Sequence, residues 1–415
     1  MQHTTGPDST LGFLRDGYLF GQRRFRPGDD AFATRLVGRR VVVMKGAGAA
    51  RFFYEDGRFD RIRSMPVSVS HLLQDEGSVQ SLEGAAHARR KALFLGILDD
   101  DGNTRLVEAF ASELERAVGG LTAAEEISLF ELFTGVLTTT ACRWVGLPDS
   151  VSQELTKTGA LATMVERAGT FGPANWAARV QRNGVERLLQ RTVRAARTDP
   201  ATARPGSPLA AMAGYLEGDD GLPSTLSEQD AAVELLNLLR PVVAVGRFMV
   251  FAALALHTHP RWRDAFTSGE ERMLRPFTQE VRRFYPFFPV IAGRATGSHE
   301  WRGHSFHTGD WVMLDLYATT HDPALWGDSQ HFRPERFVEG GVIDMNALIP
   351  QGGGHYGTGH RCPGEPVTVD LVNEAVRYLT QSMEYGVPEQ QDLRISLRRF
   401  PTLPRSGFRV EGLTL

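Results

Sequence analysis

Cys362 is the residue whose type and surroundings point most directly to chemistry. It is one of only two cysteines in 415 residues, the other being Cys142, and five glycines lie between residues 352 and 359. Those glycines remove side chains from the loop, so its backbone could lie against a flat ligand. An amphipathic segment follows Pro363, which places the sulfur at a helix N-terminus where the helix dipole favours thiolate. The pattern predicts either a nucleophile or a metal ligand.

Three interpretations of this cysteine are open at this point. A nucleophile needs a nearby base, and His360 is a candidate, but two residues along an irregular loop it cannot be relied on to face the sulfur. A metal ligand needs a cofactor. The third interpretation is a small buried cysteine without a chemical role. Two cysteines cannot form a disulfide framework or a four-cysteine iron–sulfur site, so any cysteine chemistry rests on one residue.

Arg240 and Pro241 form a second unusual pair, inside a stretch, residues 235–256, that contains no Ser, Thr, Asp or Glu. Proline within a helix removes a hydrogen bond and costs on the order of 3 kcal/mol, so the pair predicts a kink or break. The helical neighbours of Arg240 include no carboxylate, and burying an unpaired charge is costly. An anion should meet Arg240, unless it pairs with a distant acid or reaches solvent. We expect Arg247 to be such a structural case.

Glu280 and Arg283 have the E-x-x-R spacing, which places an acid and a base side by side on a helix. Alone this pair carries little, because any surface helix offers one. The segment HFRPERF, residues 331–337, and then Cys362 follow it in order. The ordered set is what gives the pair meaning.

The elements that must position these residues are mostly helices. Amphipathic patterns predict helices over residues 87–98, 104–121, 129–147, 183–199 and 227–259. Small hairpin sheets are predicted from β-rich runs at residues 33–45, 291–316 and 392–413. Residues 198–224, rich in Pro, Gly and acid, predict a loop. Without a repeat or a shift in composition, we expect a single domain over residues 1–415.

A Gly-Ala-Gly turn at residues 46–48 imitates the start of a dinucleotide-binding fingerprint. The third small residue is replaced by Arg51, and no series of βαβ units follows. The pattern instead predicts a strand joined to a helix by a flexible turn.

Composition excludes several classes of protein. The 42% apolar content and 22 prolines describe a globular chain with a substantial core. A formal net charge of −3 and a pI near 6.5 leave no basic surplus, so nucleic acid is not an expected partner. The polar start lacks a leader pattern and Arg247 interrupts the longest apolar run, so we expect no membrane anchor and a cytoplasmic location.

The residues GHRCPGE around Cys362 resemble the cysteine-ligand loop of the cytochrome P-450 (haem-thiolate) family. The E-x-x-R pair and HFRPERF match two further motifs of that family, in the family order, between residues 280 and 365. The resemblance implies a mainly α fold, with a helical body, small β-sheets and haem between the long central helix and the cysteine loop. It implies haem b (iron protoporphyrin IX), with Cys362 as the proximal iron ligand whose thiolate favours O–O cleavage.

This chain departs from the ordinary family pattern at two places. GGGHYGTG, with His355 and Tyr356, stands where F-G-x-G is usual, and the acid–threonine pair of ordinary monooxygenases is absent from residues 235–256. The pair Arg240-Pro241 instead resembles the fatty-acid peroxygenase branch. That likeness covers nearly the whole chain, including SVQSLEGAAHARRKALF, EVRRFYPFFP and LPRSGF.

The branch implies a long-chain fatty acid as substrate, with Arg240 as the anchor of its carboxylate. The carboxylate can take a proton from hydrogen peroxide, the co-substrate, and return it to the leaving oxygen, as general acid–base. No obligatory redox partner is then expected. Pro241 would remove a competing side chain or hydrogen bond at the distal face. Only the first carbons lie within reach of the iron, which predicts hydroxylation at the α or β carbon.

Five further residues match positions of the branch. Phe287 matches a pocket aromatic, although an ordinary core aromatic explains it equally well. His87, Lys91 and Arg61 match positions near the haem propionates, where basic residues would neutralise two carboxylates, and each could equally be a surface charge. Gln80 matches a position that often holds histidine in members that decarboxylate to terminal alkenes and glutamine in hydroxylating members. It predicts mostly hydroxy acid.

Three alternative functions stay in view. A fatty-acid decarboxylase giving terminal alkenes is the alternative that the inference from Gln80 opposes. A conventional monooxygenase fed by a reductase is opposed by the missing acid–threonine pair. A haem-binding sensor or carrier would need no anion anchor such as Arg240, and would be expected to have a signalling domain.

Overall fold

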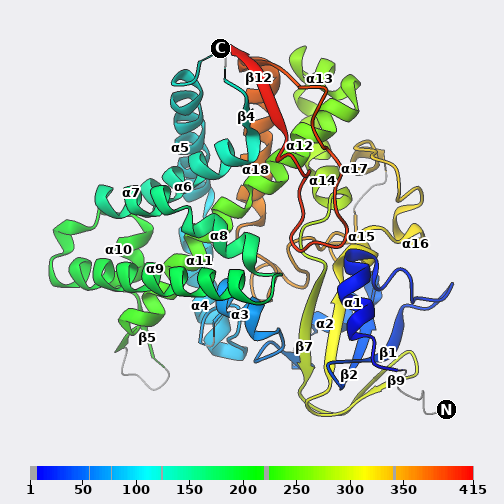
Figure 1. Ribbon diagram of the computed structural model, residues 1–415. Coiled ribbons are helices and arrows are strands. Elements are labelled where there is room, and N and C mark those ends of the chain that lie inside the picture. Colours follow the sequence, from blue (N-terminus) through cyan, green and yellow to red (C-terminus); the bar gives the residue numbers. More distant parts are fainter. Residues whose placement is uncertain are drawn as a thin grey trace.

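The computed structural model describes residues 7–55, 57–75, 77–122, 125–218, 224–339 and 343–414. The expectations for the start of the chain and for the tip of the predicted loop at 198–224 fall partly outside these residues. Figure 1 shows a helical body beside a small sheet, with the first strands (blue) at one end of the molecule and the last strand, β12 (red), at the other. The prediction of a mainly helical fold with small sheets is confirmed.

Helices make up most of the described chain. The α-helices are α1 (Thr10–Asp16), α2 (Ala47–Tyr54), α3 (Val67–Leu73), α4 (Gly84–Ile97), α5 (Asp100–Gly119), α6 (Leu129–Val145), α7 (Asp149–Thr158), α8 (Ala160–Arg167), α9 (Pro173–Thr198), α10 (Pro208–Gly214), α11 (Glu228–Ala244), α12 (Gly246–Thr258), α13 (Pro260–Thr267), α14 (Leu274–Phe284), α15 (Leu316–Thr320), α16 (Pro323–Trp326), α17 (Arg336–Glu339) and α18 (Glu365–Arg377).

Helix α5 shows how the sequence pattern produces these helices. The Asp99 carboxylate caps its start by accepting a hydrogen bond from the Gly102 N–H at 2.7 Å. One stripe of the helix is buried, and it is made of Leu106, Phe110, Leu114 and Val118. This spacing of four residues turns a single apolar face toward α6 and α18.

The main sheet has five strands in the order β1–β2–β10–β7–β3. Strands β1 and β2 are antiparallel, and β10 joins β2 in parallel with Trp311 opposite Val41. Strand β2 leads through the Gly-Ala-Gly turn into α2, as the sequence predicts. The strands are β1 (Ala31–Leu36), β2 (Arg39–Met44), β3 (Phe59–Asp60), β4 (Ile127–Ser128), β5 (Leu216–Glu217), β6 (Ser224–Thr225), β7 (Val290–Ala295), β8 (His299–Trp301), β9 (His304–Phe306), β10 (Trp311–Asp315), β11 (Glu384–Gly386) and β12 (Arg409–Thr414).

The long central helix runs in two pieces, α11 and α12. The Ser227 hydroxyl caps α11 by accepting a hydrogen bond from the Asp230 N–H at 2.9 Å. The predicted break does not fall at Arg240-Pro241, because Pro241 lies inside α11 and the two helices meet one turn later at Val245, whose backbone stays helical (φ −60°, ψ −30°). Proline lacks the N–H that would bond the carbonyl one turn earlier, which weakens the helix around it.

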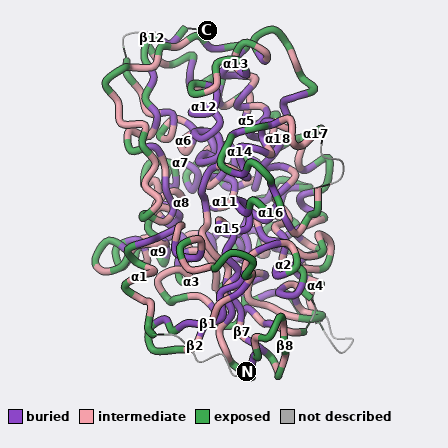
Figure 2. The backbone as a smooth tube through the Cα atoms, turned by 90° about the vertical axis from the view of Figure 1, so that its right-hand side faces the viewer, coloured by how far each residue is buried: buried purple, intermediate pink, exposed green. Residues whose placement is uncertain are grey.

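These two helices form the centre of the core. Residues 228–258 are long and apolar enough to cross a membrane, but 89% of their apolar window is buried inside the protein. Figure 2 shows the same arrangement, with buried chain (purple) through the middle of the molecule, where α11 and α12 lie. Their apolar surface is therefore covered by the rest of the fold.

The predictions of a loop over residues 198–224 and of a hairpin over residues 392–413 are both wrong in part. The segment 198–224 contains α10, β5 and β6 rather than a loop throughout. Ser207 starts α10, because its hydroxyl accepts a hydrogen bond from the Ala210 N–H at 3.2 Å and Pro208 suits the first turn. The predicted hairpin over 392–413 supplies only β12, since prolines earlier in that run lack the N–H that a strand ladder needs.

The ion pair that the E-x-x-R spacing predicts is present and buried. Arg283 and Glu280 are fully buried and lie 2.7 Å apart. Arg336, from the HFRPERF segment, joins them at 3.1 Å from Glu280. Arg247 is paired with Glu166, so the prediction of a structural role for Arg247 is confirmed.

Candidate functional site

One cavity of about 320 Å³ contains every residue that the sequence put forward for the site. It lies between α3, α4, α11, β7 and the loop that precedes α18. The predicted residues in its wall are Arg61, Gln80, His87, Lys91, Arg240, Pro241, Phe287 and Cys362. The fold thus brings a thiol, a buried arginine and several bases together from distant parts of the chain.

Cys362 is held by contacts on both sides. Its N–H donates to the Gln351 carbonyl at 3.1 Å, and its own carbonyl accepts from the Glu365 N–H at 3.3 Å. The Glu365 carboxylate in turn accepts from Arg361 at 2.5 Å and from Arg282. A fixed loop therefore presents the sulfur to the cavity.

The glycines of this loop serve a purpose that the sequence did not reveal. A Cβ on Gly353 would lie 2.9 Å from the Tyr54 ring, and a Cβ on Gly354, where φ is +80°, would lie 2.9 Å from the Tyr54 Cβ. A Cβ on Gly359 would lie 2.9 Å from the carbonyl oxygen of His355. These glycines make room for the packing of α2 and of the loop itself, in addition to any ligand.

The ionisation of the thiol differs from the prediction. Burial raises the pKa of Cys362 above its ordinary value, and the nearby Glu365 carboxylate adds to the rise. The Gly364 N–H and the charge of Lys91 act in the opposite direction. The Gly364 N–H therefore acts as the helix-start argument expects, but the desolvation of the sulfur outweighs it, so the protein environment by itself favours the thiol.

His360 is engaged away from the sulfur. Its Nε2 lies 3.1 Å from a Glu83 carboxylate oxygen, and its ring packs against His87 with centroids 4.0 Å apart. Within the described chain it makes no hydrogen bond to Cys362. The nucleophile interpretation needs that contact, so the geometry favours the metal-ligand interpretation.

Arg240 is 3% exposed and meets only neutral acceptors. Its guanidinium donates to the carbonyls of Leu72 at 2.9 Å and Leu73 at 2.5 Å, and to the Asn237 side-chain oxygen at 2.8 Å. Among the residues that the structure describes, no carboxylate lies within ion-pair distance of it. Burial and the neighbouring Arg182 lower its pKa. The carboxylates of Glu186 and Glu234 act on it only from beyond contact distance, so among the described residues this buried cation has no direct counter-ion.

Gln80 and Phe287 line the same cavity as Arg240. The Gln80 side-chain oxygen accepts a hydrogen bond from the Ser78 hydroxyl at 2.8 Å. Phe287 is buried and makes an edge contact with Phe248, with centroids 5.1 Å apart. Phe287 is thus both a core aromatic and part of the cavity wall, so the two interpretations of it are compatible.

Comparisons with known proteins decide the family. A cytochrome P-450 family model matches residues 272–368. A variant of cytochrome P450SP alpha (CYP152B1) is 38% identical, covers 99% of this chain and 100% of its own, and superposes with a TM-score of 0.93. Cytochrome P450EX alpha (CYP152N1) with myristic acid is 33% identical over 99% of both chains, with a TM-score of 0.91. The chain belongs to the cytochrome P-450 family, in its fatty-acid peroxygenase branch.

Other members of the family are matched less evenly. A variant of cytochrome P-450 OleT in complex with arachidonic acid is 30% identical over 99% of this chain and 98% of its own, with a TM-score of 0.90. Cytochrome P-450 71B29 of Arabidopsis thaliana is 31% identical over 120 residues, and ferruginol synthase of Salvia miltiorrhiza is 30% identical over 122 residues. The chain spans only 23% of the length of each plant relative. The likeness to the P450SP alpha, P450EX alpha and OleT structures extends over the whole fold, whereas the likeness to the two plant relatives covers 28% of this chain.

The basic residues of this P-450 gather around the cysteine loop and suit the two carboxylates of haem b. Lys91 donates to the carbonyl of Gly359 at 2.9 Å, and burial lowers its pKa to about 8. Burial, with His360 and Lys91 nearby, lowers the pKa of His87 to about 4, so His87 is neutral at neutral pH and offers a hydrogen bond rather than a charge. Arg61 donates to a carbonyl of β7 at 3.1 Å. A thiol, two cations and an apolar wall fit haem b as a donor set.

One polar residue of this P-450 site was missed in the sequence. Glu83 precedes the first residue of α4 without capping it: one carboxylate oxygen accepts from the Arg61 N–H at 2.8 Å and the other faces His360. It thereby joins the segment before α3 to the cysteine loop. The only signal was its position four residues before His87, which is typical of many helix starts.

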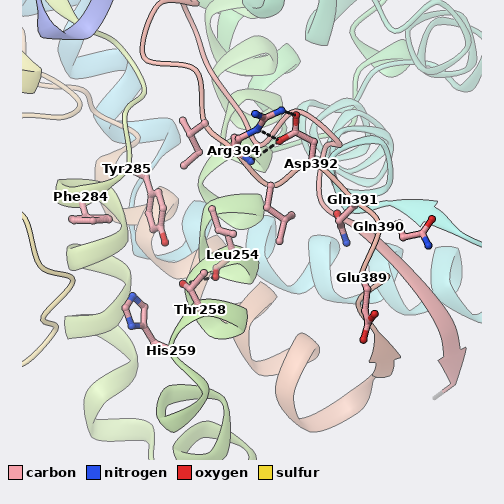
Figure 3. A pocket seen from close by; sticks show the side chains of 12 residues that line it. Leu254, Thr258, His259, Phe284, Tyr285, Glu389, Gln390, Gln391, Asp392 and Arg394 are labelled. Carbon is pink, nitrogen blue, oxygen red and sulfur yellow. Dashed lines mark hydrogen bonds and ion pairs between the residues drawn. The ribbon is translucent and has the colours of Figure 1, made fainter.

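A second hollow of this P-450 is open to solvent and lies elsewhere. The ends of α12 and α14 and residues 389–395 form it, with a volume of about 870 Å³. Figure 3 shows Tyr285 and Thr258 facing that segment, where Arg394 is already paired with Asp392 at 2.7 Å. It shares no lining residue with the Cys362 cavity. The residues proposed from the sequence for binding and catalysis therefore line the enclosed cavity and not this hollow.

Proposed function

We propose that this P-450 uses hydrogen peroxide to hydroxylate long-chain fatty acids at the α or β carbon. The observation that carries the proposal is the environment of Arg240, a buried guanidinium that meets only neutral acceptors and lines the same cavity as Cys362. A buried cation of this kind calls for an anion. A fatty acid supplies that anion together with an alkyl chain for the apolar walls.

Haem b would be held by Cys362 at its iron and by Lys91, Arg61 and His87 at its carboxylates. When bound, the haem supplies the iron centre at which the O–O bond of the peroxide is broken and a substrate carbon is oxidised. Lys91 and Arg61 would balance the charge of the carboxylates, and neutral His87 would donate a hydrogen bond. Backbone hydrogen bonds with Gln351 and Glu365 hold Cys362 in place at the cavity wall.

Arg240 would bind the substrate carboxylate through charge-assisted hydrogen bonds. Its bonds to Leu72, Leu73 and Asn237 fix the direction of its remaining N–H groups. An anchor at this point limits the reach of the site to the first carbons of the chain. Phe287 and the other apolar wall residues would hold the alkyl chain and exclude water.

The anchored carboxylate would also move the proton. Residues 235–256 contain no acid, and Glu234 just before them is absent from the cavity wall and bound by three donors. The substrate carboxylate would accept a proton from hydrogen peroxide and return it to the departing oxygen, which leaves as water. One peroxide and one C–H bond thus give one alcohol and one water.

Gln80 favours hydroxy acid over terminal alkene in this proposal. Its amide can form hydrogen bonds but cannot exchange a proton near neutral pH, unlike histidine at the same place. We further propose that the enzyme needs no obligatory redox partner and acts in the cytoplasm. A reductase-fed monooxygenase would need a proton relay that the helix over the cavity does not supply.

The test is mass spectrometry of products after the purified ferric protein is mixed with a saturated long-chain fatty acid and hydrogen peroxide, without reductase or nicotinamide. We expect hydroxy acid oxidised next to the carboxylate. A fatty alcohol of equal length is the matched control and should not react, because it offers no carboxylate. Product that appears only when a reductase and ferredoxin are added would overturn the proposal.

A further inference from the structure

Glu234 is a carboxylate that the proposed function leaves without a task. It lies on α11, six residues before Arg240, and its side chain is 0% exposed. Three donors meet it: the Val79 N–H at 2.8 Å, Arg90 at 2.5 Å and the Asn237 side-chain amide at 2.9 Å. A carboxylate so fully engaged holds other groups in place.

The charge of Glu234 fixes which way the Asn237 amide points. An ionised carboxylate only accepts hydrogen bonds, so Asn237 turns its NH₂ toward Glu234 and its oxygen away. That oxygen accepts from the Arg240 guanidinium at 2.8 Å. The three residues are spaced three apart along α11, so each is the neighbour of the next. The orientation of Arg240 therefore depends on a charge two contacts away.

The same carboxylate ties down two further parts of the site. The bond to the Val79 N–H fixes the backbone next to Gln80, which lines the cavity. The bond to Arg90 fixes α4 at the position before Lys91, another residue of the cavity wall. One side chain thus joins the central helix, the Gln80 segment and α4.

We propose that Glu234 is a positioning residue, which orients Arg240 through Asn237 and places Gln80 through the Val79 N–H. Both then meet the substrate carboxylate in one fixed geometry. This inference rests on the proposed function. A negative charge near the anchor opposes the binding of an anion, so Glu234 does not serve to raise affinity. It determines where the carboxylate is held, and hence which carbon is oxidised.

The alternative is that Glu234 only neutralises Arg90. Arg90 has a second acid, Glu217, at 2.6 Å. Glu217 bonds neither Asn237 nor Val79. The variant Glu217→Gln therefore removes one negative charge from the same arginine and leaves the hydrogen bonds from Asn237 to Glu234 and from Arg240 to Asn237 intact. It is the matched control.

Glu234→Gln keeps the shape of the side chain but cannot satisfy the three donors. If its oxygen stays with Val79 and Arg90, its NH₂ faces Asn237, whose amide must flip and turn its own NH₂ toward Arg240. If its oxygen faces Asn237 instead, its NH₂ meets the donors of Val79 and Arg90. Either arrangement sets a donor against a donor, which releases Arg240 or the Gln80 segment.

The experiment compares the haem-loaded wild type, Glu234→Gln and Glu217→Gln with one fatty acid and hydrogen peroxide. We expect Glu234→Gln to bind the fatty acid within about threefold of wild type, by spectral titration, because the lost charge opposed the anion. We expect its ratio of main product to other positional products to fall about tenfold or more, since small misplacement near a reacting centre changes rates on the order of a hundredfold. Glu217→Gln should keep the wild-type distribution.

A Glu234→Gln protein with the wild-type distribution of products would overturn the inference, and so would a Glu217→Gln protein with the same broadening. Asn237→Ala covers the case in which Glu234→Gln does not fold. It removes the side chain that links Glu234 to Arg240 and leaves the ion pair between Glu234 and Arg90. Asn237→Ala must also broaden the distribution of positional products. An unchanged distribution would contradict the proposal that Glu234 orients Arg240 through Asn237. If the wild type itself forms no product with peroxide, the proposed function fails first, and this inference fails with it.

Discussion

At the scale of single residues, two buried arginines on the central helix differ in what they meet. Arg240 meets two backbone carbonyls and an amide oxygen, whereas Arg247 meets the carboxylate of Glu166. Within the part of the chain that the structure describes, the same side chain in the same core therefore has a direct counter-ion in one place and none in the other. We assign ligand binding to the first and stability to the second on that ground.

Arg247→Leu should lower the free energy of unfolding and leave fatty-acid affinity unchanged. Removing one partner of a buried ion pair costs about 3–5 kcal/mol. We expect the lower end, because Arg399 lies 3.1 Å from Glu166 and keeps part of its compensation. Chemical denaturation and a spectral titration of the folded variant measure the two quantities. A folded variant with weakened fatty-acid binding would contradict this division of roles.

At the scale of elements, the cysteine loop is shaped by α2 as much as by its own sequence. Tyr54, the last residue of α2, packs where side chains on Gly353 and Gly354 would lie. Gly353 is limited by the Tyr54 ring and by Ile349, whereas Gly354 is limited also by its own backbone, at φ +80°. The two glycines are therefore needed for different reasons.

Gly353→Ala and Gly354→Ala should both lower haem content and the unfolding temperature. Backbone strain adds about 1–3 kcal/mol to the cost at Gly354. A second change, Tyr54→Ala, should partly restore Gly353→Ala, because it removes the ring, and should not restore Gly354→Ala. Equal recovery of both double variants would show that strain at Gly354 plays no part.

At the scale of the whole molecule, the sequence predicts those features that the spacing of nearby residues determines. The helical periodicities, the Glu280–Arg283 pair and the cysteine loop are all encoded within a few residues, and the structure confirms them. Contacts between distant segments could not be predicted, such as Tyr54 against Gly354 or Glu83 against His360. Nothing in the local sequence specifies which remote side chain will fill a given space.

The same limit applies to charge. The raised pKa of Cys362 and the neutral His87 follow from burial by the assembled fold, which a sequence pattern does not report. Two of the three acceptors of Arg240 are likewise backbone carbonyls of α3, which any residue type could supply. The sequence could therefore predict the identity of the site residues better than their electrostatics.

Asp315 makes global stability depend on pH. Burial raises its pKa from 3.8 to about 7. The folded state then binds this proton more tightly than the unfolded chain, so the free energy of unfolding falls as pH rises from 3.8 to about 7. Asp315→Asn keeps the cap on the Ala318 N–H, at 2.7 Å in the wild type, and removes this titration. Denaturation at about pH 5 and about pH 7.5 should show a smaller decline in the variant, and an equal decline would exclude Asp315 as its source.

The central claim, that Arg240 receives the substrate carboxylate, is tested most directly by comparing the binding of a fatty acid and of the fatty alcohol of equal length in wild type and Arg240→Ala, with haem content as the control. We predict that the wild type binds the acid more tightly than the alcohol, and that Arg240→Ala loses this preference by about tenfold or more while keeping its haem. A haem-loaded Arg240→Ala protein that still prefers the acid as strongly as the wild type would contradict the account.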